Sequence, residues 1–148
     1  AYFDSFPGGG SSRNPEGVGA DLDGNKLPSA PELSSALAFQ YNLPLDKFNG
    51  EFVARVDWTY SDDYFETEDN ISSAGIGNSV EWGQVDSYSL LNGRIGFESG
   101  DDWTIYLWGR NILDEDYSYG WPSDFLGTLA SYPGDPRTYG VEVTYNFR

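Results

Sequence analysis

The sequence predicts an all-β fold, an antiparallel up-and-down meander of five to six strands. Three observations predict it: apolar and polar residues alternate with a period of two, helical periodicity is missing, and connections of alternating length join the alternating segments. We expect strands at residues 33–43, 51–61, 87–98, 103–111 and 138–147, with residues 1–6 as the end of a sixth strand.

The first two segments show the alternation most simply. Residues 33–43 carry Leu, Phe and Tyr, with one Ser, at the odd positions, and Ser, Ala, Gln and Asn at the even positions. Residues 51–61 carry Phe, Ala, Val, Trp and Tyr at the even positions. The odd positions of that segment include Val53, Arg55, Asp57, Thr59 and Ser61.

The remaining three segments repeat the pattern. Residues 87–98 place Leu, Ile and Phe opposite a parity with Asn92, Arg94 and Glu98. Residues 103–111 place Trp, Ile and Leu opposite Thr, Tyr, Trp and Arg, and residues 138–147 alternate Tyr, Val and Phe with Thr, Gly, Glu and Asn. Every segment therefore has one face without charge.

The lengths of the connections favour a membrane barrel. Two connections are short, at residues 44–50 and 99–102, and three are long, at 7–32, 66–86 and 113–137. Long outer loops that alternate with short periplasmic turns are typical of a transmembrane β-barrel, and aromatic residues near the strand ends fit interfacial girdles. A water-soluble β-sandwich also has alternating strands and stays open as an alternative at this point.

Composition excludes several classes of function. The 148 residues carry 8 Lys and Arg against 24 Asp and Glu, a net charge of −16, so we expect no nucleic-acid partner. No Cys and no His are present, which removes disulfides, thiolate nucleophiles and His general bases. No run of apolar residues is long enough for a transmembrane helix, and we expect no signal peptide. Because Met is missing too, we expect a chain processed or cut from a longer protein.

Residues 23–32, 85–97, 103–117 and 136–148 carry distinctive motifs, and in these four stretches the sequence resembles the TonB-dependent outer-membrane receptors. Residues 23–32 resemble the family's G-N-x-L-P-x-A-P stretch, and residues 85–97 resemble its Y-x-L-x-N-x-R-I-G strand. Residues 103–117 resemble the more specific segment W-x-x-x-x-W-x-x-N-L-x-D-x-x-Y. Residues 136–148 resemble the closing strand, although Arg148 follows the aromatic residue on which the family's assembly signal usually ends.

This resemblance implies that residues 1–148 are the C-terminal part of a receptor barrel, incomplete and without the plug domain. The chain would then form the last five to six strands of the barrel in a Gram-negative outer membrane. The resemblance further implies uptake of a scarce solute such as a ferric siderophore, driven by a TonB-type energy-transducing protein through the missing plug. The expected partners are outer-membrane lipid and either the remainder of the barrel and plug or further copies of the chain.

Two sets of residues are candidates for function. Aromatic and carboxylate side chains in the outer loops make rigid, polar contact surfaces for a ligand, and the predicted ligand-binding residues are Tyr117, Tyr119, Trp121, Asp124 and Trp82. The polar face of the strands is predicted to face the barrel lumen. The predicted lumen-facing residues are Arg55, Arg94, Trp108, Arg110 and Glu142. A simpler interpretation of the lumenal charges is that they satisfy one another across neighbouring strands.

We expect no catalysis, no metal site and no cofactor. The Ser residues have no His to activate them, and no G-x-S-x-G elbow is present. Residues 21–25 resemble the start of a calcium loop but lack the downstream bidentate Glu. The acidic runs at 62–63 and 114–116 are expected to be solvated loop charge, with a possible role in bridging divalent ions to lipopolysaccharide phosphates.

Two alternative functions stay open. A processed receptor fragment, released to the extracellular space, would self-assemble into a β-stacked fibre, which predicts a repeat of about 4.7–4.8 Å. A soluble β-sandwich would bind carbohydrate through the Tyr and Trp loops and would be a monomer in plain buffer.

Overall fold

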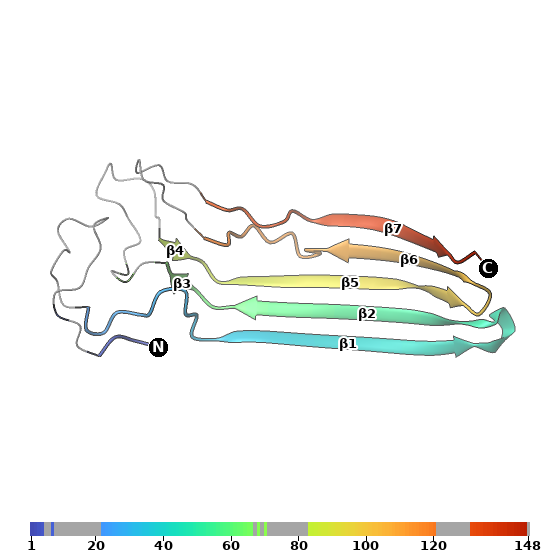
Figure 1. Ribbon diagram of the computed structural model, residues 1–148, viewed down its shortest axis with the longest axis horizontal. Coiled ribbons are helices and arrows are strands. Elements are labelled where there is room, and N and C mark those ends of the chain that lie inside the picture. The colour runs from blue at the N-terminus through green and yellow to red at the C-terminus, as the bar shows by residue number, and fades with distance from the viewer. Residues whose placement is uncertain are drawn as a thin grey trace. The chain divides into compact units, whose positions relative to one another are not determined.

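The structure is a computed structural model that describes residues 1–4, 7, 22–66, 68, 70, 83–120 and 131–147. Its long elements are strands (Figure 1). They are β1 (Ser34–Leu45), β2 (Gly50–Ser61), β5 (Tyr88–Ser99), β6 (Trp103–Arg110) and β7 (Thr138–Tyr145). The short elements are the 3-10 turn η1 (Asp46–Phe48) and the strands β3 (Tyr64–Phe65) and β4 (Gln84–Val85).

The five long strands form one sheet in the order β1-β2-β5-β6-β7. Neighbouring arrows run in opposite directions in Figure 1, so the sheet is antiparallel. Each long strand pairs with the next long strand along the chain. The predicted all-β antiparallel meander is confirmed. In the part of the chain that the structure describes the sheet is open, with β1 and β7 as its edges.

The sixth strand expected at residues 1–6 does not join this sheet in the described residues 1–4. Tyr2 forms an isolated bridge with Lys26 instead. Phe3 N donates to Asn25 O at 2.8 Å, and Leu27 N donates to Ala1 O at 3.0 Å. The expected long connection at 66–86 also differs from the prediction, because it contains β4, which pairs with β3 in a separate two-stranded sheet.

The two short connections are tied to each other at one end of the sheet. Asn49 follows η1 in the left-handed region, with φ of 46°, a conformation that Asn tolerates better than most residues. Its carbonyl accepts a hydrogen bond from Gly100 N at 2.6 Å, and its side-chain amide donates to Asp101 Oδ1 at 3.1 Å. The long connections begin and end at the opposite ends of the strands.

The register separates the two faces of the sheet. Ile95, Leu107 and Val141 lie side by side across β5, β6 and β7, as do Phe97, Ile105 and Val143 one step further along. On the other face, Arg94 lies opposite Trp108, and Gly96 lies opposite Tyr106. The predicted alternation is thus kept across all three strands.

The apolar face is the exposed one. Leu37 and Phe39 of β1 are 67% and 66% exposed, and Val143 of β7 is 66% exposed, whereas Tyr106 on the polar face is only 7% exposed. A β-sandwich would bury this apolar face against a second sheet, so the exposure favours a sheet with its apolar face in lipid.

Contacts divide the chain into two units. One unit holds the long sheet, Ser35–Tyr60, Ser89–Glu115 and Asp135–Arg148. The other holds the N-terminal segment and the long connections, Ala1–Ser34, Ser61–Tyr88 and Asp116–Gly134. No helix among the described residues is both long and apolar enough to cross a membrane.

Candidate functional site

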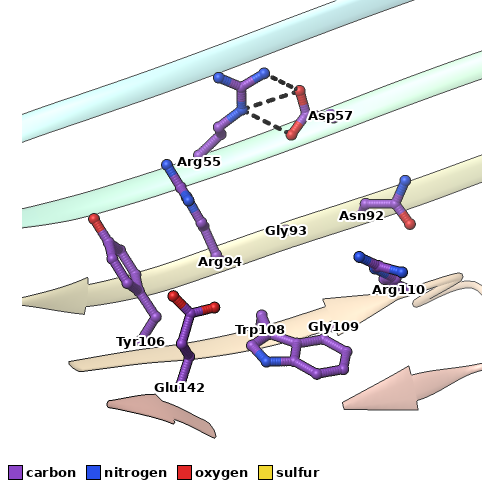
Figure 2. Close-up of a pocket in the computed structure, with 10 residues that line it drawn as sticks. All are labelled: Arg55, Asp57, Asn92, Gly93, Arg94, Tyr106, Trp108, Gly109, Arg110 and Glu142. Atoms are coloured by element: carbon purple, nitrogen blue, oxygen red, sulfur yellow. Dashed lines mark hydrogen bonds and ion pairs between the residues drawn. The ribbon is translucent and has the colours of Figure 1, made fainter. Parts of the chain in front are cut away.

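A hollow of about 470 Å³ lies on the polar face of the long sheet (Figure 2). Its side chains come from β2, β5, β6 and β7, all within one unit of the chain. We call it the polar hollow. Its lining residues are Arg55, Asp57, Asn92, Gly93, Arg94, Tyr106, Trp108, Gly109, Arg110 and Glu142.

Arg55 and Asp57 form a bidentate ion pair on β2. Arg55 Nη2 lies 2.6 Å from Asp57 Oδ1, and Arg55 Nε lies 2.9 Å from Asp57 Oδ2. The two side chains leave the strand on the same face because they are two positions apart. The charge of Arg55 is therefore satisfied within β2 itself, whereas the simpler interpretation of the lumenal charges placed such contacts across neighbouring strands.

Arg94 and Arg110 are placed differently. The Arg94 guanidinium lies over the Tyr106 ring at 4.8 Å, and the Arg110 guanidinium lies over the Trp108 ring at 5.7 Å. Among the described residues neither guanidinium makes an ion pair within 4 Å. An Arg stacked on a ring keeps the N–H groups on the rim of its plane available to an acceptor.

Glycine residues give the two rings room to lie on the sheet. A Cβ at Gly140 would lie 2.5 Å from Trp108 Cζ2 and 2.7 Å from Cε2. A Cβ at Gly96 would lie 2.5 Å from Tyr106 Cδ1. Each of these β6 rings thus contacts a glycine of a neighbouring strand and an arginine guanidinium.

The structure brings all five predicted lumen-facing residues to the polar hollow. Sequence reasoning left Tyr106, Gly96 and Gly140 out of that set. Tyr106 alternates with the same set of residues as Trp108 and Arg110, so the sequence could have placed it on the polar face. The two glycines contact the rings only because of the cross-strand register, which the sequence does not reveal.

Of the predicted ligand-binding residues, Tyr117 and Tyr119 are described, and Trp121, Asp124 and Trp82 lie outside the described residues. The Tyr117 and Tyr119 hydroxyls lie 2.9 Å apart. The Tyr117 ring packs against Tyr88, with centroids 5.0 Å apart, and Tyr64 Oη donates to the Tyr119 carbonyl at 3.1 Å. Burial raises the pKa of Tyr64, so its hydroxyl stays protonated as a donor.

A short antiparallel ribbon carries the two tyrosines. Gly134 N donates to Tyr117 O at 2.7 Å, and Tyr119 N donates to Tyr132 O at 2.9 Å. Ser118 bridges Pro133 between them. The two tyrosines therefore lie on backbone that is hydrogen-bonded to a neighbouring segment.

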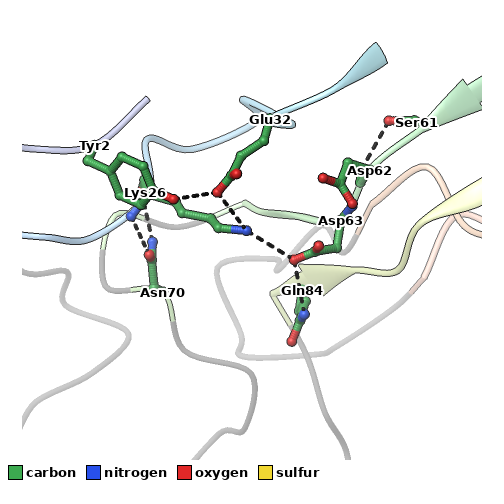
Figure 3. A network of polar contacts seen from close by, with 8 residues as sticks. All are labelled: Tyr2, Lys26, Glu32, Ser61, Asp62, Asp63, Asn70 and Gln84. Atoms are coloured by element: carbon green, nitrogen blue, oxygen red, sulfur yellow. Dashed lines mark hydrogen bonds and ion pairs between the residues drawn. The ribbon is translucent and has the colours of Figure 1, made fainter. Parts of the chain in front are cut away.

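A polar network joins the N-terminal segment to the residues before β1 and after β2 (Figure 3). Lys26 Nζ lies 3.3 Å from Asp63 Oδ2 and 3.4 Å from Glu32 Oε1, and the Tyr2 hydroxyl donates to Glu32. Lys26 N donates to Asn70 Oδ1 at 2.5 Å, and the Asn70 amide donates to Lys26 O at 2.8 Å. The network holds three separate stretches of chain together.

The electrostatics of the network follow from these contacts. Hydrogen bonds from Tyr2 and then Lys26 lower the pKa of Glu32. Burial lowers the pKa of Lys26, but hydrogen bonds and charges from Asp63 and Glu32 outweigh it and raise that pKa overall.

Two of the acidic residues expected to be solvated loop charge have cationic partners. Asp63 pairs with Lys26, and Asp114 lies 2.9 Å from Arg137 Nη2. Of residues 21–25, the described part forms a turn in which Asn25 N donates to Leu22 O at 3.0 Å. Among the described residues no group of three or more Asp, Glu, His or Cys is placed to hold a metal ion.

The sequence matches the family model described as "TonB dependent receptor-like, beta-barrel" over residues 1–112. The chain belongs to this family. It is therefore part of an outer-membrane β-barrel, as the resemblance implied.

The chain is similar to two known proteins. The chain is 32% identical over 81 residues to the ferric-pyoverdine M114 receptor PbuA of Pseudomonas sp. (strain M114), a match that covers 53% of this chain and 8% of the receptor. Its fold matches the crystal structure of the ferric yersiniabactin uptake receptor FyuA from Yersinia pestis with a TM-score of 0.66 and 14% identity. That match covers 87% of this chain and 18% of FyuA, so the chain spans less than a fifth of either protein.

Proposed function

We propose that residues 1–148 are the C-terminal part of the barrel wall of an outer-membrane receptor that takes up a scarce solute of the ferric-siderophore class. The observation that carries the proposal is the division of one sheet into an exposed apolar face and a charged, hollowed face. A wall that separates lipid from a solute path needs this division. PbuA is named for ferric pyoverdine and FyuA for ferric yersiniabactin, which supports this class of solute.

In this proposal the five residues predicted to face the lumen do so from the polar hollow, and the loop residues contact the solute. Tyr117 and Tyr119 offer two rings held edge to face and two hydroxyls on a paired ribbon, a rigid surface for aromatic and polar contacts with a ligand. Trp121, Asp124 and Trp82 complete the proposed contact set.

The energy source and the partners follow from the same proposal. A plug domain inside the barrel and a TonB-type protein of the inner membrane would drive release of the solute. This chain contributes the wall and the loops, and no step of the proposal assigns it a catalytic role.

The test is uptake of radiolabelled iron by cells of the source organism that lack the gene encoding this chain, complemented with wild-type or variant gene. Supplied with a panel of ferric siderophores, wild-type cells are expected to take up at least one, and collapse of the proton gradient is expected to abolish uptake. A Tyr117→Ala, Tyr119→Ala variant is expected to raise the half-saturating concentration about tenfold or more through loss of aromatic contacts. Leu113→Ala, an exposed position on the same loop, is the matched control. Uptake that is independent of the gene for every siderophore would contradict the proposal.

A second candidate is the self-assembling fibre, which the open edges β1 and β7 favour. X-ray fibre diffraction tests it, because stacked strands give a reflection near 4.7–4.8 Å. Material extracted in detergent that gives no such reflection excludes this candidate.

A further inference from the structure

Four tyrosines gather within the unit that holds the long connections. Tyr117, Tyr119 and Tyr132 lie on the paired ribbon, and the Tyr88 ring packs against Tyr117 with centroids 5.0 Å apart. The rings of Tyr117 and Tyr119 meet edge to face, with centroids 5.2 Å apart. We call these four residues the tyrosine face. Two of them, Tyr88 and Tyr132, are not among the ligand-binding residues predicted from the sequence.

The pairing of the ribbon places its tyrosines on one side. Ser118 bridges Pro133 in antiparallel fashion, so the residues next to them, Tyr119 and Tyr132, lie opposite each other. Side chains of directly opposite residues point to the same face, and Tyr117, two positions from Tyr119, shares that face. Tyr119 is 52% exposed and Tyr132 is 59% exposed, so both rings are accessible to a ligand.

Contacts beneath and beside the rings hold the tyrosine face in place. The Tyr117 ring lies over Gly134, where a Cβ would overlap it. The hydroxyl of Tyr64 on β3 donates to the Tyr119 carbonyl at 3.1 Å, which ties the ribbon to a second connection of the same unit. Rings that are ordered before a ligand arrives lose little further conformational entropy on binding.

The unit that carries the tyrosine face is strongly acidic. By sequence, its three ranges hold 14 Asp and Glu residues and only two basic residues, Arg13 and Lys26. The ranges of the long sheet hold the other ten Asp and Glu residues and six of the eight basic residues. Lys26 is itself ion-paired, with Asp63 and Glu32. The field around this unit therefore attracts cations and repels anions.

Carboxylates also lie close to the rings themselves. The Glu66 carboxylate lies against Gly120, the ribbon residue that follows Tyr119. Asp116, which precedes the first tyrosine of the ribbon, is exposed. The next basic residue after the ribbon, Arg137, has its charge paired with Asp114 at 2.9 Å. The charges nearest to the tyrosine face are thus negative.

Aromatic rings and carboxylates select the same sign of charge. The face of a phenol ring carries the negative part of its quadrupole, so it attracts a cation placed within about 6 Å of the ring centroid. Organic ammonium groups are bound in this way by clusters of aromatic side chains. An anionic group would be repelled by the ring faces and by the carboxylates together.

We propose that the tyrosine face binds an organic ammonium group, held against the exposed rings of Tyr119 and Tyr132 and attracted by the surrounding carboxylates. The role of this site in uptake rests on the proposed function, which it deepens, because it gives the solute that these loops select a positive charge. It also makes Tyr132 a ligand-contact residue.

Choline is the probe, and neohexyl alcohol, in which a carbon atom replaces the charged nitrogen, is the comparison of the same shape. Both are titrated into the whole protein that carries this chain, extracted from its source in an uncharged maltoside detergent, and affinity is measured by saturation-transfer NMR. Choline is expected to bind about tenfold or more tightly than neohexyl alcohol. High salt is expected to weaken the binding of choline alone.

Variants locate the bound cation. Tyr119→Leu and Tyr132→Leu are each expected to weaken choline binding about fivefold, because each removes one ring face but keeps an apolar side chain. Tyr132→Phe keeps the ring and is expected to stay within about twofold of wild type. Tyr139→Leu on β7 removes a tyrosine of similar exposure, 65%, outside the unit and is expected to leave affinity unchanged. Heat-modifiable migration on gels verifies that each variant is folded.

Equal affinity for neohexyl alcohol, no binding of choline, or wild-type affinity in the Tyr119→Leu, Tyr132→Leu double variant would each overturn the site. Iron uptake is measured separately on the same variants. Gene-dependent uptake in the wild type together with failure of choline to bind removes the site and leaves the proposed function standing. Tyrosine-dependent binding of choline without uptake of any siderophore supports the site and removes the proposed function.

Discussion

Asn111 shows at the scale of one residue how a buried amide fixes the base of a long loop. It is 3% exposed and lies in the left-handed region with φ of 47°. Its Oδ1 accepts from Glu115 N at 2.9 Å, and its Nδ2 donates to the carbonyls of Glu115 at 2.8 Å and Asp135 at 3.1 Å. One side chain thereby joins the two ends of the loop that carries Tyr117 and Tyr119.

Replacing Asn111 is expected to separate these two loop ends. Asn111→Gly keeps the backbone conformation but removes three partly buried hydrogen bonds, at a cost of about 2 kcal/mol or more. Hydrogen exchange at the Glu115 amide is expected to accelerate about 30-fold. Asn111→Asp retains the acceptor and loses the donor, so its effect on that amide is expected to be smaller. The exposed Asn42→Gly is the control, and unchanged exchange in Asn111→Gly would refute the role.

Titration of Glu32 gives a prediction of pH dependence. Because its folded pKa lies below the ordinary value of 4.5, its contacts with Tyr2 and Lys26 stabilise the network above that pH and are lost as the pH falls through the folded value. Its hydrogen bond raises the pKa of Tyr2 above 10.0, so on the alkaline side the Tyr2 contact is lost only as the pH rises through that raised value. The Tyr2 ring resonances, followed by NMR, are expected to show an acid step with a midpoint below 4.5. Glu32→Gln is expected to remove the step, and a midpoint at or above 4.5 would contradict the contact.

At the scale of the element, glycine on one strand and a ring on the next form a unit that sequence alone does not reveal. Gly140→Ala on β7 is expected to displace the Trp108 indole, because the new Cβ would lie 2.5 Å from Cζ2. Overpacking of this kind costs about 1–3 kcal/mol. The temperature at which the folded band disappears in heat-modifiability gels is expected to fall.

A double-mutant cycle isolates the clash, since in Trp108→Ala the Gly140→Ala change is expected to cost little. An equal cost of Gly140→Ala with and without the indole would show that the ring does not lie on the glycine.

The strands were predictable from the sequence because their period of two is a local property. Residues 103–111 alternate apolar and polar side chains, and β6 runs over Trp103–Arg110. The bridge of Tyr2 to Lys26 and the pairing of β3 with β4 were not predictable, because two-residue contacts leave no periodic pattern. The five residues predicted to face the lumen lie in one hollow because parity already places them on one face. The contacts of the β6 rings depend on which residue of β5 and β7 meets each residue of β6, and that register is a tertiary property.

At the scale of the whole molecule, the sheet has one face suited to an apolar environment and one face suited to water. Leu107 lies between Ile95 and Val141 on the exposed apolar face, at 53% exposure. Thr104 lies on the opposite face of the same strand, opposite Glu98. In water the exposed apolar band would be a site of aggregation, whereas in a bilayer it is the surface that holds the sheet in place.

Charge placed on the two faces should therefore have opposite consequences. Leu107→Arg is expected to cost about 2–4 kcal/mol, because an arginine at the lipid face near the middle of a strand must leave water. Thr104→Arg places the same side chain beside Glu98 on the polar face and is expected to cost little. The amount of folded protein recovered in outer-membrane fractions measures the difference, with Leu107→Arg reduced several-fold below Thr104→Arg. In a water-soluble sheet the order would be reversed, since Leu107→Arg would break an exposed apolar band, so the ranking of these two variants alone decides in which solvent the apolar face resides.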